Sequence, residues 1–434
     1  MGEDIFQNYV TILEEELIPA LGCTEPIAVA YAAAKARQML GAMPEHITVY
    51  CSGNIVKNVK SVTVPNSKGL RGIDAAAILG VVGGRAEKEL EVLDDVQPED
   101  IAQTKLLLER HFCDTQLVEN VDKLYLKLLL QLGRESASVT IQGHHTNITD
   151  MEKNGEVLFH CEYTEDASAV RRGDRKQLRV DGILEFADRV ELARIRPILS
   201  RQIRCNMRIS QEGLSGGYGA EVAAALLESG GDNVFTVARA KAAAASEARM
   251  SGCALPVVIN SGSGNQGITV SVPVIEYVHA KDLSEEKLYR ALAVSNLISI
   301  YLKFFIGDLS AFCGAVTAAC GAGAALAYLD GLGYLGVADT ITNTLAAVSG
   351  IFCDGAKPSC AAKISSALDA AFLSLTMARR HQAFHPGEGV VGVDVEQTIR
   401  SVGHIGRRGM DETDQEILRI MLQTQTENPS RELC

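Results

Sequence analysis

The chain has 434 residues, of which 47% are hydrophobic, and a formal net charge of −13. This length allows a large core and two or three substructures. Because nucleic acids and anionic membranes attract basic surfaces, the acidic balance argues against both as partners and leaves small metabolites open.

The first 180 residues carry both helical and strand patterns. The first residues are acidic where a secretory signal has lysines followed by an apolar run, and they lack the arginine-rich bias of a transit peptide. We therefore expect a cytoplasmic protein. Helical periodicity predicts helices at 4–18 and 24–40, the second with Thr24 as N-cap and Pro26 in its first turn. Segments rich in β-branched residues predict strands at 46–58, 59–65, 137–150 and 155–164. Residues 1–180 are therefore predicted to form an N-terminal α+β region with a sheet.

The rest of the chain, residues 181–434, is predicted to be a largely helical domain that follows a charged connection at 171–182. The clearest helical patterns span 186–205, 220–229, 234–250 and 285–305. Residues 310–329 carry no charge but are dominated by alanine and glycine. A membrane span would be richer in Leu, Ile and Phe, so we expect a buried central helix there. The fold class is thus α+β.

One segment interrupts the helical pattern. Residues 255–275, "LPVVINSGSGNQGITVSVPVI", read as extended, and their "GSGNQG" matches the glycine spacing of dinucleotide-binding turns. That fingerprint needs a helix after the glycines, whereas a β-type sequence follows here, so a nucleotide site is disfavoured. A cradle for a small anion such as a carboxylate and a plain connecting turn are the two main interpretations.

The cysteines are more informative. The chain has 11, an odd number, which in a long intracellular protein favours free thiols, metal ligands or catalysis over disulfides. Cys313, Cys353 and Cys360 have the spacing C-x39-C-x6-C. Spacing alone leaves buried core thiols as an alternative. Zinc is disfavoured because the two short cysteine pairs of structural zinc sites are missing. Three thiolates suit an iron-sulfur cluster with one open iron, which is a Lewis acid.

Several motifs together resemble a known family, namely "ALGCTEPIAVAYAAA", "SGNIVKN", "GHHTNI", "SQEGLSG", "ARMSGCALP", "NSGSGNQGITV" and "FCDGAKPSC". From about residue 10 to 425 the chain is similar to the L-cysteine desulfidase family, also called the UPF0597 group. Its helical half resembles the α chain of bacterial iron-sulfur L-serine dehydratases. The resemblance implies a serine-dehydratase-α-like domain and a [4Fe-4S] cluster on Cys313, Cys353 and Cys360, with Cys320 left to core packing.

The implied activity is β-elimination of L-cysteine to pyruvate, ammonia and hydrogen sulfide at an open iron. L-serine is the alternative substrate, since it differs by one atom. A pyridoxal phosphate lyase would need a Schiff-base lysine, for which "NSKGLRG" at 66–72 is a faint match. A thiol-based redox or iron sensor would carry a basic DNA-binding element, which we do not find. A homodimer is a reasonable expectation for a metabolic enzyme.

The remaining site residues follow from the motifs. Cys23 is the candidate base, because a thiol at a helix N-terminus has a lowered pKa, although Glu25 opposes this and packing in a tight turn is the alternative. Donors to the substrate carboxylate and amine, or else turn-forming residues, are Ser52, Asn54, Ser261, Ser263 and Asn265. Lys57 is a further anion contact, and His145 lines the pocket or is structural, with His144 on the other face of a strand. Cys434 is either an ordinary tail residue or a cap for the open iron.

Overall fold

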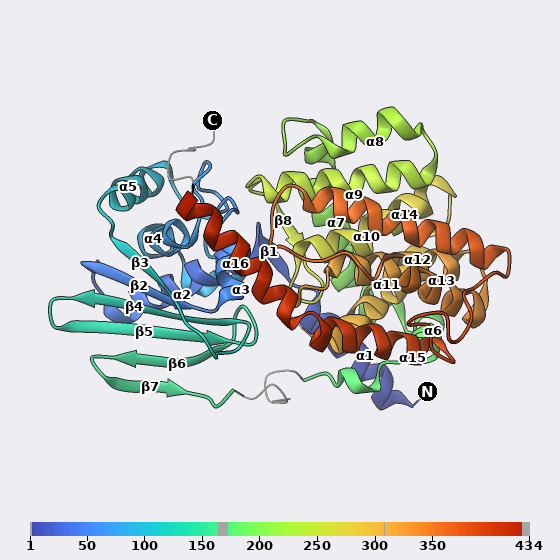
Figure 1. Cartoon of the computed structure of the whole chain (residues 1–434), viewed down its shortest axis with the longest axis horizontal. Coiled ribbons are helices and arrows are strands. Elements are labelled where there is room, and N and C mark those ends of the chain that lie inside the picture. The colour runs from blue at the N-terminus through green and yellow to red at the C-terminus, as the bar shows by residue number, and fades with distance from the viewer. Residues whose placement is uncertain (1, 164–171, 308, 428–434) are drawn as a thin grey trace.

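A computed structural model describes residues 2–163, 172–307 and 309–427. It is an α+β structure, with a mixed sheet in the N-terminal region and a larger helical part (Figure 1). The α+β fold class predicted from the sequence is confirmed. The expected division between residues 180 and 181 stays a prediction.

The sheet has six strands in the order β3-β2-β4-β5-β6-β7, of which β2 and β3 are parallel and the other neighbours antiparallel. Alternate leucines of β4, Leu126, Leu128 and Leu130, are buried, and α2 packs against β4 and β5. The strands are β2 (His46–Cys51), β3 (Cys113–Leu117), β4 (Tyr125–Leu132), β5 (Glu135–Gln142), β6 (Ile148–Lys153) and β7 (Glu156–His160). The accompanying helices are α2 (Thr24–Leu40), α3 (Gly53–Val59), α4 (Ile73–Gly83), the 3-10 helix η1 (Ala86–Glu91) and α5 (Pro98–Glu109).

The strand predicted at 46–58 is confirmed only as far as Cys51, where β2 ends, and the strand predicted at 59–65 is wrong. Residues 53–59 form α3, because Ser52 accepts a hydrogen bond from the Ile55 amide and so caps a helix. Residues 59–65 form a turn in which only Thr63 makes an isolated bridge, to Arg71. The predicted strand at 137–150 is divided into β5 and β6 by a turn. Strands β3 and β4 were not predicted, since β4 is leucine-rich and leucine is also a strong helix former.

The helical part is built around α12 (Gly314–Leu329), which contacts four neighbouring helices and is buried at every residue from 315 to 327. Close approach depends on its small residues, since a Cβ on Gly321 would lie 2.3 Å from the Ser295 carbonyl oxygen. The predicted buried central helix is confirmed. Its neighbours are α10 (Gly264–Ala280), α11 (Glu285–Ile306), α13 (Gly333–Val348) and α14 (Cys360–Arg379).

The outer helices complete this part of the fold. They are α6 (Val180–Arg189), α7 (Leu192–Leu214), α8 (Val222–Gly230), α9 (Val234–Met250) and α15 (Val395–His404), with short helices η2 (Arg175–Gln177) and η3 (Ile405–Gly409). By length and composition α11 and α14 could each cross a membrane. In α11, however, 83% of the most apolar 18-residue stretch is buried inside the protein, and in α14 the share is 50%. A buried core helix can have the same length and apolar composition as a membrane span, so these two features alone are weak evidence for a span.

The extended structure predicted for 255–275 is wrong beyond its first residues. Strand β8 (Pro256–Val258) ends before a turn, and α10 then begins at Gly264 with Ser263 as its cap. The β-branched residues of α10 are buried, so tertiary packing overrides their strand propensity. The glycine turn therefore does have a strand before it and a helix after it.

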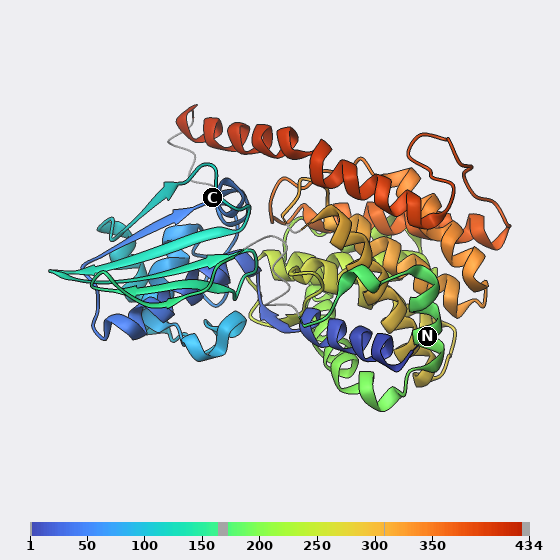
Figure 2. The same ribbon diagram turned by 90° about the horizontal axis from the view of Figure 1, so that it is seen from below.

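Both ends of the chain cross between the two parts. Helix α1 (Glu3–Glu16) packs against α7 and α11, and β1 (Pro19–Leu21) then pairs with β8. At the other end α16 (Asp411–Glu427) reaches back to contact α3, and both views show it extending from the helical part toward the sheet (Figures 1 and 2). These crossings bring distant residues together at one cavity.

Candidate active site

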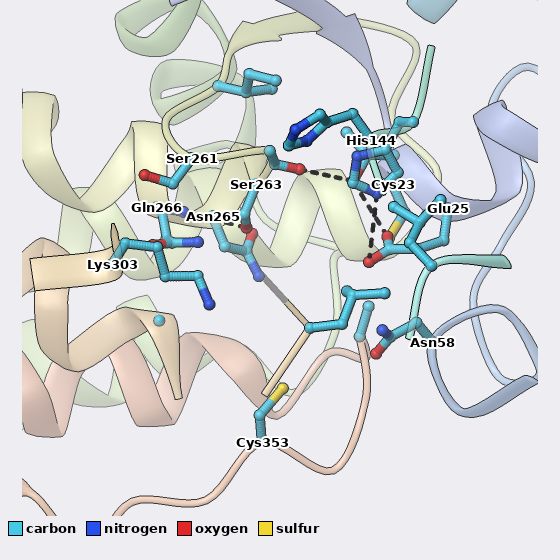
Figure 3. A pocket seen from close by; sticks show the side chains of 18 of the residues that line it. Cys23, Glu25, Asn58, His144, Ser261, Ser263, Asn265, Gln266, Lys303 and Cys353 are labelled. Atoms are coloured by element: carbon cyan, nitrogen blue, oxygen red, sulfur yellow. Dashed lines mark hydrogen bonds and ion pairs between the residues drawn. The ribbon is translucent and has the colours of Figure 1, made fainter. Parts of the chain in front are cut away.

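A cavity of about 400 Å³ is lined by residues from both parts of the fold (Figure 3). The sequence-predicted residues that line it are Cys23, Lys57, His145, Ser261, Ser263, Asn265, Cys313, Cys353 and Cys360. Nine of the eleven predicted site residues therefore face one volume, although they lie more than 300 residues apart in the chain.

Four helices begin at this cavity. Cys23, Ser263 and Cys313 are the N-caps of α2, α10 and α12, and Cys360 is the first residue of α14. The first amides of a helix lack intrahelical acceptors, and the helix dipole places partial positive charge at this end. The arrangement therefore favours anions such as carboxylates and thiolates.

The three predicted ligand cysteines approach one another from two chain segments. Phe312 and Phe352 form an isolated antiparallel bridge, and the Cys313 amide donates to the Ile351 carbonyl at 3.1 Å. Cys360 follows the turn after Cys353, with its Sγ 3.7 Å from the Gly355 carbonyl oxygen. Backbone pairing thus explains how residues forty positions apart come to line the same cavity.

Electrostatics also indicate that these thiols are neighbours. Burial and, to a smaller extent, the neighbouring Cys353 together raise the pKa of Cys313 to about 12. Burial and Cys353 likewise raise the pKa of Cys360. All ten described cysteines are free. Within the described ranges, no three His, Cys, Asp or Glu side chains converge on a single metal ion.

The donor set nevertheless fits an iron-sulfur cluster. A cluster distributes its thiolate ligands over separate irons, so its cysteines do not need to converge on one point. Three soft sulfur donors at a buried cavity with helix N-termini are suited to an anionic iron-sulfur unit. Cys320 lies instead in the core of α12, fully buried and outside the cavity lining.

Cys23 and Glu25 lie side by side on the wall (Figure 3), and His145 joins them in a second cluster. The Cys23 thiol donates to Glu25 Oε2 at 3.2 Å. His145 Nε2 lies 3.8 Å from Glu25 Oε1, too far for a hydrogen bond, and this nitrogen is buried without a hydrogen-bond partner. Burial alone would raise the pKa of Glu25, but the nearby imidazole and thiol hold it at about 2. Glu25 is therefore ionised.

The expected lowering of the Cys23 pKa is wrong for the free protein. Cys23 itself is the N-cap of α2, a position that the sequence assigned to Thr24. Burial raises the pKa of Cys23 well above its usual value, and the Glu25 carboxylate raises it further, while Arg249 opposes them. Desolvation and like-charge repulsion thus outweigh the helix dipole. Cys23 is a thiol in this state.

Polar side chains on the glycine turn face the same cavity. Asn265 Oδ1 accepts hydrogen bonds from Arg249 Nη1 at 3.1 Å and from Ser246 Oγ at 3.2 Å. Its amide nitrogen is thereby oriented away from them as a donor. Ser261 has a left-handed backbone, with φ +48°, and its hydroxyl donates to the buried Asn260 Oδ1 at 3.0 Å. Strain of this kind persists where surrounding contacts impose it.

Three predicted roles do not match the geometry. Ser52 donates to the Lys123 carbonyl at 2.6 Å and caps α3, outside the cavity lining. Asn54 lies in the first turn of α3, also outside the lining. Lys57 lines the cavity, but its ammonium forms a buried ion pair with Asp414 of α16, which already compensates its charge. Turn and cap chemistry therefore explains the "CSGN" segment.

The sequence reasoning also missed several lining residues. His144 lines the cavity together with His145, because residues 143–147 form a turn and not a strand. Arg249, Gln266 and Lys303 were not proposed. The sequence did carry a signal for Lys303, because it is a lysine near the end of an apolar helix. Lysines are rarely buried, so one in such a helix indicates a functional or paired charge. Cys434 lies outside the described residues.

Comparison with known proteins agrees with this description. The family model for the serine dehydratase alpha chain matches residues 87–419, which places the chain in a serine-dehydratase-like lyase class. A UPF0597 protein of Lachnoclostridium phytofermentans is 50% identical over 96% of this chain and 100% of the relative. The chain belongs to the UPF0597 family and carries a serine dehydratase α-like domain.

Further relatives have the same description. A UPF0597 protein of Desulfitobacterium hafniense is 49% identical over 96% of this chain and 97% of the relative. One from Treponema denticola is 46% identical, with 96% and 98% covered. The resemblance to the UPF0597 group is therefore confirmed over 96% of the chain, and the resemblance to serine dehydratase α chains over residues 87–419.

Proposed function

We propose that the chain is an iron-sulfur carbon–sulfur lyase that converts L-cysteine to pyruvate, ammonia and hydrogen sulfide. One observation carries the proposal: Cys313, Cys353 and Cys360 line the same cavity as the Cys23–Glu25 pair. The first group supplies soft metal ligands and the second supplies proton-transfer groups, as an elimination requires. L-serine dehydration is the second candidate, because the matching family model describes serine dehydratases.

The three cysteines would hold a [4Fe-4S] cluster, with one iron left without a protein ligand. When bound, the cluster would supply a Lewis acid that stabilises the departing sulfur. Pyridoxal phosphate chemistry at the "NSKGLRG" loop is disfavoured by the position of Lys68, which is exposed and outside the cavity lining.

The protein's own groups would act on the amino acid. Cys23, as a thiolate, would take the proton from Cα, and the electron pair would form the Cα–Cβ double bond as the Cβ–S bond breaks. The sulfur would depart as hydrosulfide with its own proton and would take up the proton held by Cys23, so that hydrogen sulfide forms and the Cys23 thiolate is restored. The resulting aminoacrylate would tautomerise to an imine, which water hydrolyses to pyruvate and ammonia.

The glycine turn would hold the substrate carboxylate. The Asn265 amide and the Ser263 hydroxyl, which accepts from the Gln266 amide, are donors at the N-terminus of α10, where the helix dipole also favours a negative charge. The Ser261 hydroxyl donates to Asn260 instead and helps to hold the turn in place.

The decisive experiment uses anaerobically reconstituted protein. Hydrogen sulfide and pyruvate are measured with L-cysteine and with L-serine on the same sample, together with iron and acid-labile sulfide. A brown protein with about four irons per chain that releases hydrogen sulfide faster than it dehydrates serine supports the proposal. Faster turnover of serine reassigns the enzyme to serine dehydration. A yellow, iron-free protein that loses activity to carbonyl reagents rejects the cluster.

Cys23→Ala tests the proposed base. The variant should keep the visible spectrum of the cluster and lose turnover, because the substituted side chain is separate from the three ligands. Loss of the spectrum would instead make Cys23 a cluster ligand.

A further inference from the structure

Among the residues that the structure describes, three carboxylates line the cavity, and two of them are already paired. Glu15 and Glu16 accept hydrogen bonds from Arg175 Nη1 at 2.7 Å and from Nη2 at 2.8 Å. Arg175 is itself buried, so its charge is matched by these two acids. They are therefore occupied by a structural ion pair.

Glu25 differs from them in its partners. Its Oε2 lies 3.2 Å from the Cys23 thiol and 3.1 Å from the Thr24 hydroxyl, both neutral groups. Within the part of the chain that the structure describes, its ion-pair contact is the His145 imidazole at 3.8 Å. This contact is longer than a hydrogen bond, so a ligand cation at hydrogen-bond distance would compensate the buried carboxylate more closely than His145 does.

An α-amino acid supplies that cation. Its ammonium group carries three N–H donors and needs acceptors, whereas the Asn265 amide and the Ser263 hydroxyl of the glycine turn are suited to its carboxylate. We propose that Glu25 binds the α-ammonium group of the substrate and so selects amino acids over hydroxy acids. This inference rests on the proposed function, because it assigns one end of the same substrate.

The two ends of a small amino acid fit the spacing of these groups. The Thr24 hydroxyl lies 3.1 Å from Glu25 Oε2 and 3.0 Å from the Gly262 carbonyl oxygen, so a single hydroxyl spans the gap between Glu25 and the glycine turn. Ser261 and Ser263 flank Gly262 in the turn. The ammonium and carboxylate subsites therefore adjoin, with Cys23 beside the first (Figure 3).

This assignment also explains how a thiol with a raised pKa can become a base. The Glu25 charge is one cause of the raised pKa of Cys23. An ammonium paired with Glu25 cancels much of that charge, so the Cys23 thiolate becomes more accessible when substrate is bound. Binding and activation are then coupled through one carboxylate.

The test uses ligands that cannot eliminate. L-alanine has both charged groups, whereas L-lactate replaces the ammonium with a hydroxyl. Isothermal titration calorimetry of anaerobic protein should show that L-alanine binds about 10- to 100-fold more tightly than L-lactate, as one charged hydrogen bond predicts. In Glu25→Gln the affinity for L-alanine should fall to that for L-lactate.

Glu16→Gln is the matched control, since it removes a carboxylate of the same cavity that is already paired. It should keep the preference for L-alanine. Equal affinity of the wild type for both ligands overturns the inference, and this comparison needs no variant if Glu25→Gln fails to fold. An unchanged preference in a folded Glu25→Gln also overturns it. The proposed function fails by a different result, the absence of product from both L-cysteine and L-serine.

Discussion

Replacing Asp414 by Asn should destabilise the protein strongly. The Lys57 ammonium pairs with the Asp414 carboxylate, and the two side chains are only 2% and 8% exposed. The amide would leave Lys57 charged and uncompensated in the interior. Breaking a buried pair from one side costs about 3–5 kcal/mol. Urea unfolding, monitored by circular dichroism, measures the change in the free energy of unfolding.

The same helix provides the control. Lys123 pairs with Asp411 at 2.7 Å, but those side chains are 43% and 45% exposed. Asp411→Asn should therefore cost no more than about 1 kcal/mol. A combined Lys57→Met and Asp414→Leu variant should recover most of the loss, because it removes both charges. Equal losses for Asp414→Asn and Asp411→Asn would refute the reasoning from burial.

Three further predictions concern the cavity and its walls. Replacing any one of the three proposed ligand cysteines by alanine should abolish the brown chromophore, whereas Cys320→Ala should keep it. Visible absorption after anaerobic reconstitution distinguishes the variants, and the reverse pattern would identify Cys320 as a ligand. Gly267→Ala should lower the free energy of unfolding by about 1–3 kcal/mol, because the added Cβ would lie 2.0 Å from the Val258 carbonyl oxygen. Gly350→Ala is the control and should change the free energy of unfolding little, since a Cβ there has no described atom within 4 Å. The pKa of Glu25 is lowered from 4.5 to about 2 in the folded state, so its stabilising effect is complete above pH 4.5 and is lost as the pH falls toward 2. Between pH 6 and pH 3 the wild type should lose more stability than Glu25→Gln, and parallel losses would contradict the shift.

The sequence was most informative where local chemistry determined the structure. The helix at 24–40 and the central alanine-rich helix are recognisable from periodicity and composition, and their positions are confirmed. The glycine turn was placed correctly, but the helix after it was not. Its valines, isoleucines and threonines favour strands in isolation, and only their burial among other helices makes α10.

The candidate site was predictable in part for a similar reason. Motif chemistry identified the cysteines and the Ser261–Asn265 turn, all of which line the cavity. The role of Glu25 depends on which carboxylates are already paired, and the ion pairs of Glu15 and Glu16 with Arg175 join residues about 160 positions apart. Spacing in the sequence cannot reveal such long-range pairing.

The contact between Thr24 and Gly262 has a consequence for biosynthesis. The two residues are 238 positions apart, and Cys23, next to Thr24, is buried against Met250 from the same later part of the chain. At about 5–20 residues per second, a ribosome takes on the order of 10 to 50 seconds to make the intervening chain. For most of that interval the Cys23 thiol lacks its contact with Met250 and is more accessible to oxidants. These contacts can therefore form only in the second half of translation. Until then, the Cys23 thiol of the nascent chain needs protection.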